Sequence, residues 1–351
     1  MTVEHEKKEN YQFIDAIRCI AMMFIVAEHC FSAGPNRYRY GSDLYWTFLS
    51  SIQVAKFGTI TFFLLAGFLL GDNFVNYTPF QYFKRRLSNT VAPWLFWSIL
   101  FILFDIVRDY LTPPIGHSEL FTWNNIYLNI LGLYKYSNYW FIINFMISLS
   151  ILLLIRKFLY SISLGVILAL FTIFYSVNIY YLWVFPNHTT AILGFVFFIW
   201  AGVQLRKNWM HFDKMVRRTP YSLIISLVVL AYFFSIYESI ILEDFPGDKT
   251  NTLRFSNILY SLACFYLLLK IRTFDFLGGL RPRQTTYGIY LVHFVIIVFL
   301  LPLIFPNVKV SHLTPAQFVG YRLVWFASAY TVSFLIVRLI SKTSAKRLVG
   351  N

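Results

Sequence analysis

The 351-residue chain is poor in charged residues, which make up 13% of the sequence, whereas hydrophobic residues make up 58% and aromatic residues 20%. An average soluble domain carries about twice that share of charge. Apolar runs of about 20 residues, the length that spans a bilayer, recur between residues 14 and 340. The composition therefore excludes an ordinary soluble protein and predicts an all-α integral membrane protein.

Cysteine is also scarce, since the chain has only Cys19, Cys30 and Cys264, each in an apolar segment. Three scattered cysteines supply neither a disulfide framework nor the closely spaced ligands of a metal site. We therefore expect no metal. No polar segment is long enough to form a separate soluble domain, so residues 1–351 are expected to form one multi-pass domain with a transmembrane core from about 12 to 340.

About ten helices are expected to cross the membrane, separated by polar or Gly/Pro-containing turns. The formal net charge is +14, and in this layout most Lys and Arg residues lie on one side. Lys and Arg accumulate in cytoplasmic loops, so both termini are predicted to be cytoplasmic. The same rule explains the positive charge without a nucleic-acid partner, and none is expected. The predicted spans are residues 12–32, 57–75, 91–110, 138–156, 160–182, 189–205, 221–241, 253–271, 285–305 and 317–340.

The connecting segments differ in character. Residues 43–54 are expected to form an amphipathic helix on the outer face, and residues 111–137, with Pro and Gly, a longer outer loop. The basic segment 206–219 is expected to be an inner loop, and residues 1–10 are placed in the cytoplasm.

The first predicted span carries an unusual set of polar residues, including Asp15, Arg18, Glu28 and His29. Arg18 and His29 are eleven residues apart, which places them on nearly the same helix face, about 16 Å apart along the axis. Asp15 lies one turn before Arg18 and can pair with it, whereas Glu28 points about 100° away from His29. An Arg near a helix end can also snorkel, and a membrane His can simply bond to another helix. The alignment of Asp15, Arg18 and His29 favours a functional role.

A basic run, Lys84-Arg85-Arg86, follows the second predicted span. Such a run is usually a topology signal or a contact for lipid headgroups. Its guanidinium groups could instead bind phosphate through charge-assisted hydrogen bonds. Arg18 is expected at a similar depth, so the basic residues together could hold a polyanionic cofactor.

Three other features have mainly structural interpretations. Ala66, Gly67 and Gly71 form a small-residue face that permits close helix packing. Tyr290 and His293 could bond across helices or line a cavity. The aromatic segment 138–141 is interpreted as a membrane-interface belt, with a sugar-stacking surface as the weaker alternative.

Charged residues in the other predicted spans lie mainly toward the outer ends, where we expect solvent to reach them. These residues are Asp105, Arg108, Asp109, Glu238 and Arg322.

The first two spans resemble those of the membrane acyltransferase-3 family. Asp15, Arg18 and His29 match the family's D-x-x-R start and its Arg-x10-His signature. The segment FFLLAGFLL at 62–70 is similar to a family motif, with Ala66 in place of the usual Ser.

Later segments resemble the same family in the same order. Lys84-Arg85-Arg86 followed by Pro93 is similar to its basic turn, and Tyr139-Trp140-Phe141 to its W-F segment, with Asn138 where a His often stands. The stretch TYGIYLVH at 286–293 resembles its late S-Y-x-x-Y-L-x-H motif. Ala66 and Asn138 are departures that bear on the subfamily and the acceptor.

The resemblance implies a stand-alone surface-polysaccharide O-acetyltransferase in the plasma membrane, in contact with membrane lipid. It would transfer an acyl group, usually acetyl, from cytosolic acyl-CoA to a hydroxyl of a cell-surface glycan or its lipid-linked precursor. His29 would be the general base or would carry the acyl group, and Asp15 would orient Arg18.

The resemblance also implies residues that would bind the acetyl-CoA donor. Arg18, Arg85 and Arg86 would contact the CoA phosphates, and Tyr290 and His293 would lie near the thioester. A polysaccharide exporter of the same membrane family is the alternative function. Transporters often contain two related halves with broken helices, and the sequence shows no such repeat. The oligomeric state cannot be read from the sequence.

Overall fold

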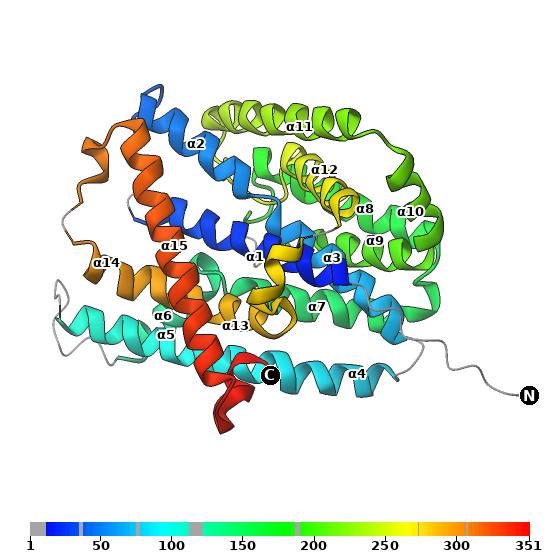
Figure 1. The fold of residues 1–351 in the computed structure, drawn as a ribbon, viewed down its shortest axis with the longest axis horizontal. Coiled ribbons are helices and arrows are strands. Elements are labelled where there is room, and N and C mark those ends of the chain that lie inside the picture. Colours follow the sequence, from blue (N-terminus) through cyan, green and yellow to red (C-terminus); the bar gives the residue numbers. More distant parts are fainter. Residues whose placement is uncertain are drawn as a thin grey trace, which may run out of the picture.

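The computed structural model describes residues 12–34, 38–74, 78–111, 122–186, 190–272, 274–306 and 308–351. Every regular element within these ranges is helical, which confirms the all-α prediction (Figure 1). The prediction for residues 1–10 lies outside the described part of the chain.

The α-helices are α1 (Gln12–Ser32), α2 (Asp43–Ala55), α3 (Gly58–Phe74), α4 (Pro79–Arg86), α5 (Ala92–Leu111), α6 (Trp123–Tyr136), α7 (Trp140–Leu154), α8 (Ile162–Tyr181), α9 (Val196–Lys207), α10 (Trp209–Arg218), α11 (Tyr221–Ile241), α12 (Phe255–Ile271), α13 (Pro282–Val295), α14 (Leu301–Ile304) and α15 (Pro315–Ile340). A π-helical turn, Leu87–Val91, joins α4 to α5, and another, Ile296–Leu300, joins α13 to α14.

Six helical segments are long and apolar enough to cross a membrane, and a seventh arises if the bent pair α6 and α7 counts as one span. The chain is therefore a multi-pass membrane protein. Three other predicted spans coincide with helices that are less suited to cross a membrane. Helix α1 carries three charged residues, and α9 and α12 are short, with 12 and 17 residues. The count of ten spans thus remains a prediction. The six segments are Asp43–Gly71, Pro79–Leu111, Ile162–Tyr181, Tyr221–Asp244, Pro282–Ile304 and Pro315–Ile340.

Two segments predicted as loops are helices. Helix α6 lies within the predicted outer loop and begins at the cap residue Thr122, whose side chain accepts a hydrogen bond from the backbone N–H of Asn125. It is followed by α7 at an angle of 72°. Helix α10 replaces the predicted basic loop at 206–219. Both helices carry polar residues among their apolar ones, and a short helix of mixed composition is easily taken for a loop.

Glycines bring α3 and α9 into backbone contact at the centre of the molecule. A Cβ atom added at Gly67 would lie 1.9 Å from the carbonyl oxygen of Ile199, and one added at Gly202 would lie 2.1 Å from that of Leu64. Only glycine leaves room for backbones this close. The predicted small-residue face is therefore confirmed as a packing surface.

Both ends of the described chain lie beside the start of α13. Asp15, in the first turn of α1, lines a small hollow together with Gln284. The side-chain amide of Asn351 donates a hydrogen bond of 3.0 Å to the backbone carbonyl of the same Gln284. The start of α1 and the C-terminus therefore lie at the same end of the molecule. That both are on one side of the membrane stays a prediction, as does the compartment which that side faces.

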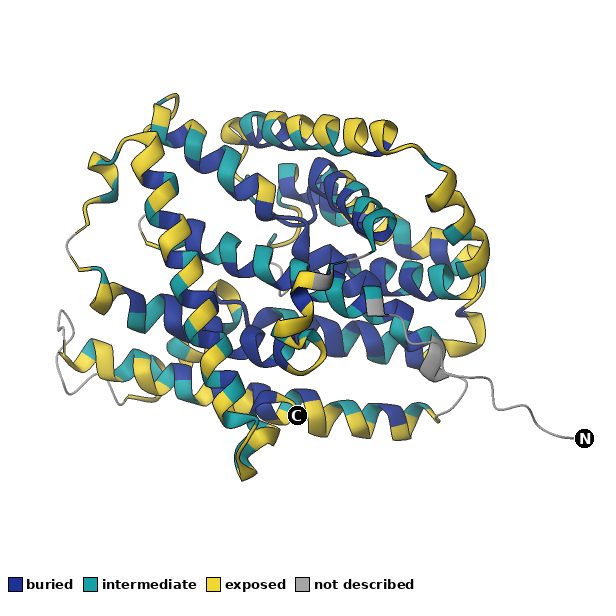
Figure 2. Ribbon diagram, viewed as in Figure 1, coloured by how far each residue is buried: buried dark blue, intermediate teal, exposed yellow. Residues whose placement is uncertain are grey.

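Buried residues concentrate on the central helices, whereas α11 and the outer faces of α5 and α15 are largely exposed (Figure 2). Exposed apolar side chains on such helices suit contact with lipid.

The expected exposure of two charged residues was wrong, since Glu238 and Arg322 are each only 2% exposed. Glu238 accepts hydrogen bonds from the backbone N–H of Phe255 and of Ser256, at the start of α12. Arg322 donates to the carbonyl oxygen of Ala33 at the end of α1, at 2.7 Å. Both charged side chains therefore form hydrogen bonds with backbone N–H or C=O groups at helix ends, which lack partners within their own helices, rather than facing solvent.

Candidate functional site

Helices α1 and α13 lie side by side and run parallel. Near their N-termini, Asp15 of α1 and Arg283 of α13 line the same hollow. Near their C-termini, the rings of His29 and His293 lie 5.4 Å apart between centroids. The histidines follow Arg18 and Arg283 by eleven and ten residues, or about 16 and 15 Å along each helix. The two helices thus bring Arg18 and Arg283 near each other at their N-terminal ends, which we call the basic level. They bring His29 and His293 together toward their C-terminal ends, which we call the histidine level.

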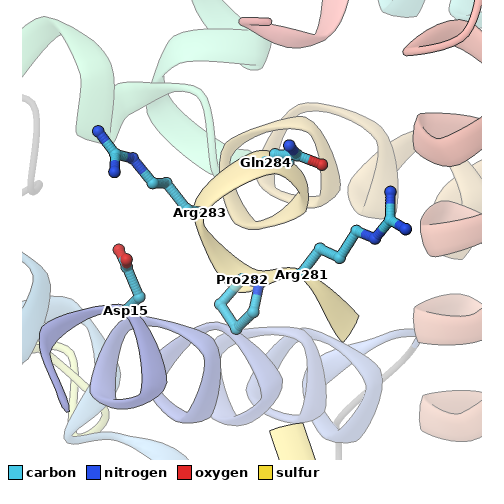
Figure 3. A pocket seen from close by; sticks show the side chains of 5 residues that line it. All are labelled: Asp15, Arg281, Pro282, Arg283 and Gln284. Atoms are coloured by element: carbon cyan, nitrogen blue, oxygen red, sulfur yellow. The ribbon is translucent and has the colours of Figure 1, made fainter. Parts of the chain in front are cut away.

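The basic level contains guanidinium groups from three helices. Arg18 forms an ion pair of 3.2 Å with Asp15, as predicted from their spacing. Arg86 and Arg283 lie close enough to Arg18 to interact with it electrostatically. Figure 3 shows Asp15 and Arg283 extending into the same space, a hollow of about 240 Å³, whereas Arg281 points away from them.

Arg283 is a site residue that was not expected from the sequence. Its segment was assigned to a basic loop, but Pro282 occupies the first turn of α13 and Arg281 precedes it with a φ of +47°. Proline is favoured at the start of a helix, so Pro282 was the signal that could have placed Arg283 on a helix beside Arg18.

The two arginines of the basic run have different environments. Arg86 donates a hydrogen bond of 2.9 Å to the Tyr82 hydroxyl, and its guanidinium lies 5.2 Å from the centre of that ring. Arg85 is exposed. The structure therefore brings Arg86 to the basic level near Arg18 and leaves Arg85 exposed.

The histidine level is more enclosed than the basic level. His293 is fully buried, and its Nδ1 lies 3.0 Å from the carbonyl oxygen of Ile289. A carbonyl can only accept, so in the neutral imidazole Nδ1 carries the hydrogen and Nε2 carries the lone pair. Nε2 has no hydrogen-bond partner among the described residues. The buried ring thus offers an acceptor atom beside His29.

Tyr290 links α13 to the segment that precedes α7. Its hydroxyl donates to the backbone carbonyl of Asn138 at 2.6 Å, and the Asn138 amide donates back to the carbonyl of Tyr290 at 2.9 Å. Tyr139 adds a bond of 2.9 Å to the carbonyl of Leu291. The Tyr290 hydroxyl is therefore engaged with backbone, and its predicted contact with the donor remains untested.

The segment 138–141 is not the predicted interface belt. Asn138, Tyr139 and Trp140 are buried, with exposures of 2%, 0% and 8%. The weaker alternative of a sugar-stacking surface at these residues fails for the same reason. The aromatic residues here position α13, and through it His293.

Glu28, the remaining charged residue of α1, is separate from the site. Its carboxylate forms an ion pair of 2.7 Å with Lys56, as its different helix face allows. Within the described ranges, no cluster of three His, Cys, Asp or Glu side chains is placed to hold a metal ion.

Comparison with known proteins adds a family to this geometry. A family model for an acyltransferase domain, acyltransferase 3, matches residues 11–341. No curated protein and no solved structure matches the chain. The match covers nearly the whole chain and includes both the Arg and the His levels of α1 and α13. The protein therefore belongs to the acyltransferase-3 family.

Proposed function

We propose that the protein is a plasma-membrane O-acyltransferase that moves an acyl group, most simply acetyl, from cytosolic acyl-CoA to a hydroxyl of a cell-surface glycan or its lipid-linked precursor. The observation that carries the proposal is the pair of parallel helices α1 and α13, with arginines at one level and histidines at the other. A long donor could place its phosphates at the first level and its thioester at the second.

The arginine level suits the phosphates of the CoA donor. Arg86 and Arg283 lie close enough to Arg18 to interact with it electrostatically, and Arg283 lines a small hollow together with Asp15. Guanidinium groups form strong, charge-assisted bonds to phosphate. The ion pair with Asp15 holds Arg18 in place before the donor arrives. Arg85 is exposed and would make a weaker contact.

The histidine level suits the chemical step. His29 takes the proton of the acceptor hydroxyl as its oxygen attacks the thioester carbonyl carbon. The carbon–sulfur bond then breaks, and His29 returns the proton to the leaving CoA sulfur. If His29 instead carries the acyl group, its ring nitrogen attacks the thioester carbonyl carbon, the carbon–sulfur bond breaks and the CoA thiolate leaves. The acceptor oxygen then attacks the acyl carbon, the carbon–nitrogen bond breaks, and the freed ring nitrogen takes the hydroxyl proton.

His293 can assist His29 in the general-base route. Its Nε2 carries a lone pair without a partner among the described residues, and the two rings are close. We propose that this atom accepts a hydrogen bond from one N–H of His29. The other nitrogen of His29 would then hold the lone pair that takes the hydroxyl proton.

A labelled-donor assay tests the proposed function. The purified protein is supplied with radiolabelled acetyl-CoA and a glycan extract from cells that produce it, and both CoA release and label in the glycan are measured. His29→Gln is the matched variant, because an amide keeps a hydrogen bond but takes up no proton near neutral pH. We expect a loss of 10² to 10⁴ in rate, as is typical for a general base. Equal transfer by the variant would show that His29 is structural.

A further inference from the structure

A second hollow lies between α5, α6 and α13, on the far side of the histidines from the basic level. Its volume is about 240 Å³. It is lined by Phe101 and Asp105 of α5, by Asn129, Gly132 and Tyr136 of α6 and by Phe294 of α13. We call it the α5–α6 groove.

The groove is next to the proposed base. The ring of Phe294 lies 5.3 Å from that of His29 in an edge-on arrangement, and it also stacks on Phe101 at 5.8 Å. Phe294 lines the groove as well. A single aromatic ring therefore connects the groove to His29.

The groove combines two polar side chains with an aromatic lining. Asp105 supplies a carboxylate, which also pairs with Arg108 at 2.6 Å. The amide nitrogen of Asn129 is buried and has no hydrogen-bond partner in the described structure. A buried donor of this kind calls for an acceptor that the protein itself does not provide.

The position of the groove fits the acceptor rather than the donor. Asp105 follows Arg86 by 19 residues within one continuous helical segment, Pro79–Leu111. At 1.5 Å per residue this separates the groove from the basic level by about 28 Å. The CoA phosphates and a ligand in the groove would therefore approach His29 from opposite sides.

From these observations we infer that the α5–α6 groove binds a sugar ring of the acceptor and presents one hydroxyl to His29 past Phe294. Asn129 and Asp105 would hydrogen-bond hydroxyl groups, which both donate and accept. The aromatic rings would cover the apolar face of the sugar. The inference rests on the proposed function and assigns its acceptor site. A groove that takes up only an alkyl chain of a lipid is the competing outcome.

Cysteine labelling tests the groove without requiring turnover. Gly132 lines it, and an added Cβ at this position meets no atom within 4 Å, so Gly132→Cys fits without strain. The native cysteines Cys19, Cys30 and Cys264 are buried and should react slowly with a maleimide. Gly320→Cys is the matched control, since Gly320 is also unobstructed and lies on α15, outside the groove.

The full-length variants are purified in lauryldimethylamine oxide, which contains no sugar. Maleimide labelling is timed with added octyl β-D-glucoside or with tetraethylene glycol mono-octyl ether, which has the same tail but no sugar. We expect the glucoside alone to slow labelling of Gly132→Cys several-fold, and Asn129→Leu to abolish this protection. Labelling of Gly320→Cys should be the same with both amphiphiles.

Equal protection by both amphiphiles, or protection by neither, would overturn the sugar assignment. Binding of CoA to the same Gly132→Cys protein is measured in parallel by calorimetry. If the glucoside protects Gly132→Cys but CoA does not bind, the groove is a sugar site and the proposed CoA donor is wrong. If CoA binds but the glucoside does not protect, the donor is supported and the sugar site is wrong. The two proposals can therefore fail separately.

Discussion

Substitutions at His293 provide the sharpest test of how the two histidines work together. His293 uses Nδ1 to donate to the carbonyl of Ile289 and leaves Nε2 as an acceptor. An Asn side chain can place its amide N–H near Nδ1 but has no atom at the position of Nε2. A Gln side chain is one bond longer and can place its carbonyl oxygen near Nε2. The two variants therefore separate the structural bond from the proposed bond to His29.

The size of the effect follows from the nature of the bond. His29 becomes charged as it takes the hydroxyl proton, so its bond to His293 strengthens in the transition state. A hydrogen bond to a charged group contributes about 1.5–3 kcal/mol. Each 1.4 kcal/mol is a factor of ten in rate, so His293→Asn should lower kcat/KM by about 10- to 150-fold. His293→Gln should retain much more of the activity.

The assay is transfer of label from acetyl-CoA, measured beside the thermal unfolding of each purified variant. Both variants should unfold near the wild-type temperature, because each fills most of the imidazole volume. Near-normal transfer by His293→Asn would refute the proposed bond to His29. If both variants lost activity equally while remaining folded, an acceptor atom at Nε2 could not be the explanation.

Three further predictions concern the donor site, the packing and the topology. Arg86→Ala should weaken CoA binding measured by calorimetry by about 1.5–3 kcal/mol, and Arg85→Ala by less, because Arg85 is exposed; equal effects would contradict the assignment of Arg86 to the phosphate level. Gly67→Ala should lower thermal stability clearly, since overpacking costs about 1–3 kcal/mol or more, whereas Gly320→Ala should not; unchanged stability of both would refute the backbone contact of α3 with α9. A reporter fused at Asn351 should be cytoplasmic, and an external reading would reverse the orientation.

The sequence by itself determined the features that depend on one helix at a time. The spacing of Asp15, Arg18 and His29 fixes their common face, and the structure confirms the ion pair of the first two. Apolar composition determined the all-helical, membrane-embedded class. The small-residue face around Gly67 indicated close packing, which the structure shows against α9. Helical periodicity is local, so these conclusions needed no knowledge of neighbouring helices.

Tertiary structure decided which helices share a site. The predicted span 285–305 includes His293, but its periodicity does not say that α1 lies parallel to it or that Arg283 lies on the same helix. The same limit applies to Trp140, where an aromatic residue at a helix start can face either lipid or protein. The structure shows that this segment is buried and that Asn138 pairs with Tyr290 of α13. Contacts between helices far apart in the chain depend on packing that no single segment encodes.

The α5–α6 groove shows the same division most clearly. The sequence predicts Asp105 near the outer end of a span, but it predicts a loop where α6 lies. The position of Asn129 beside Asp105 could therefore not be predicted. The helix forms there because the Thr122 side chain caps its first turn and Leu133 packs into the core. Most of the stability of such a short helix comes from tertiary packing rather than from its own propensity, so the groove it lines exists only in the folded protein.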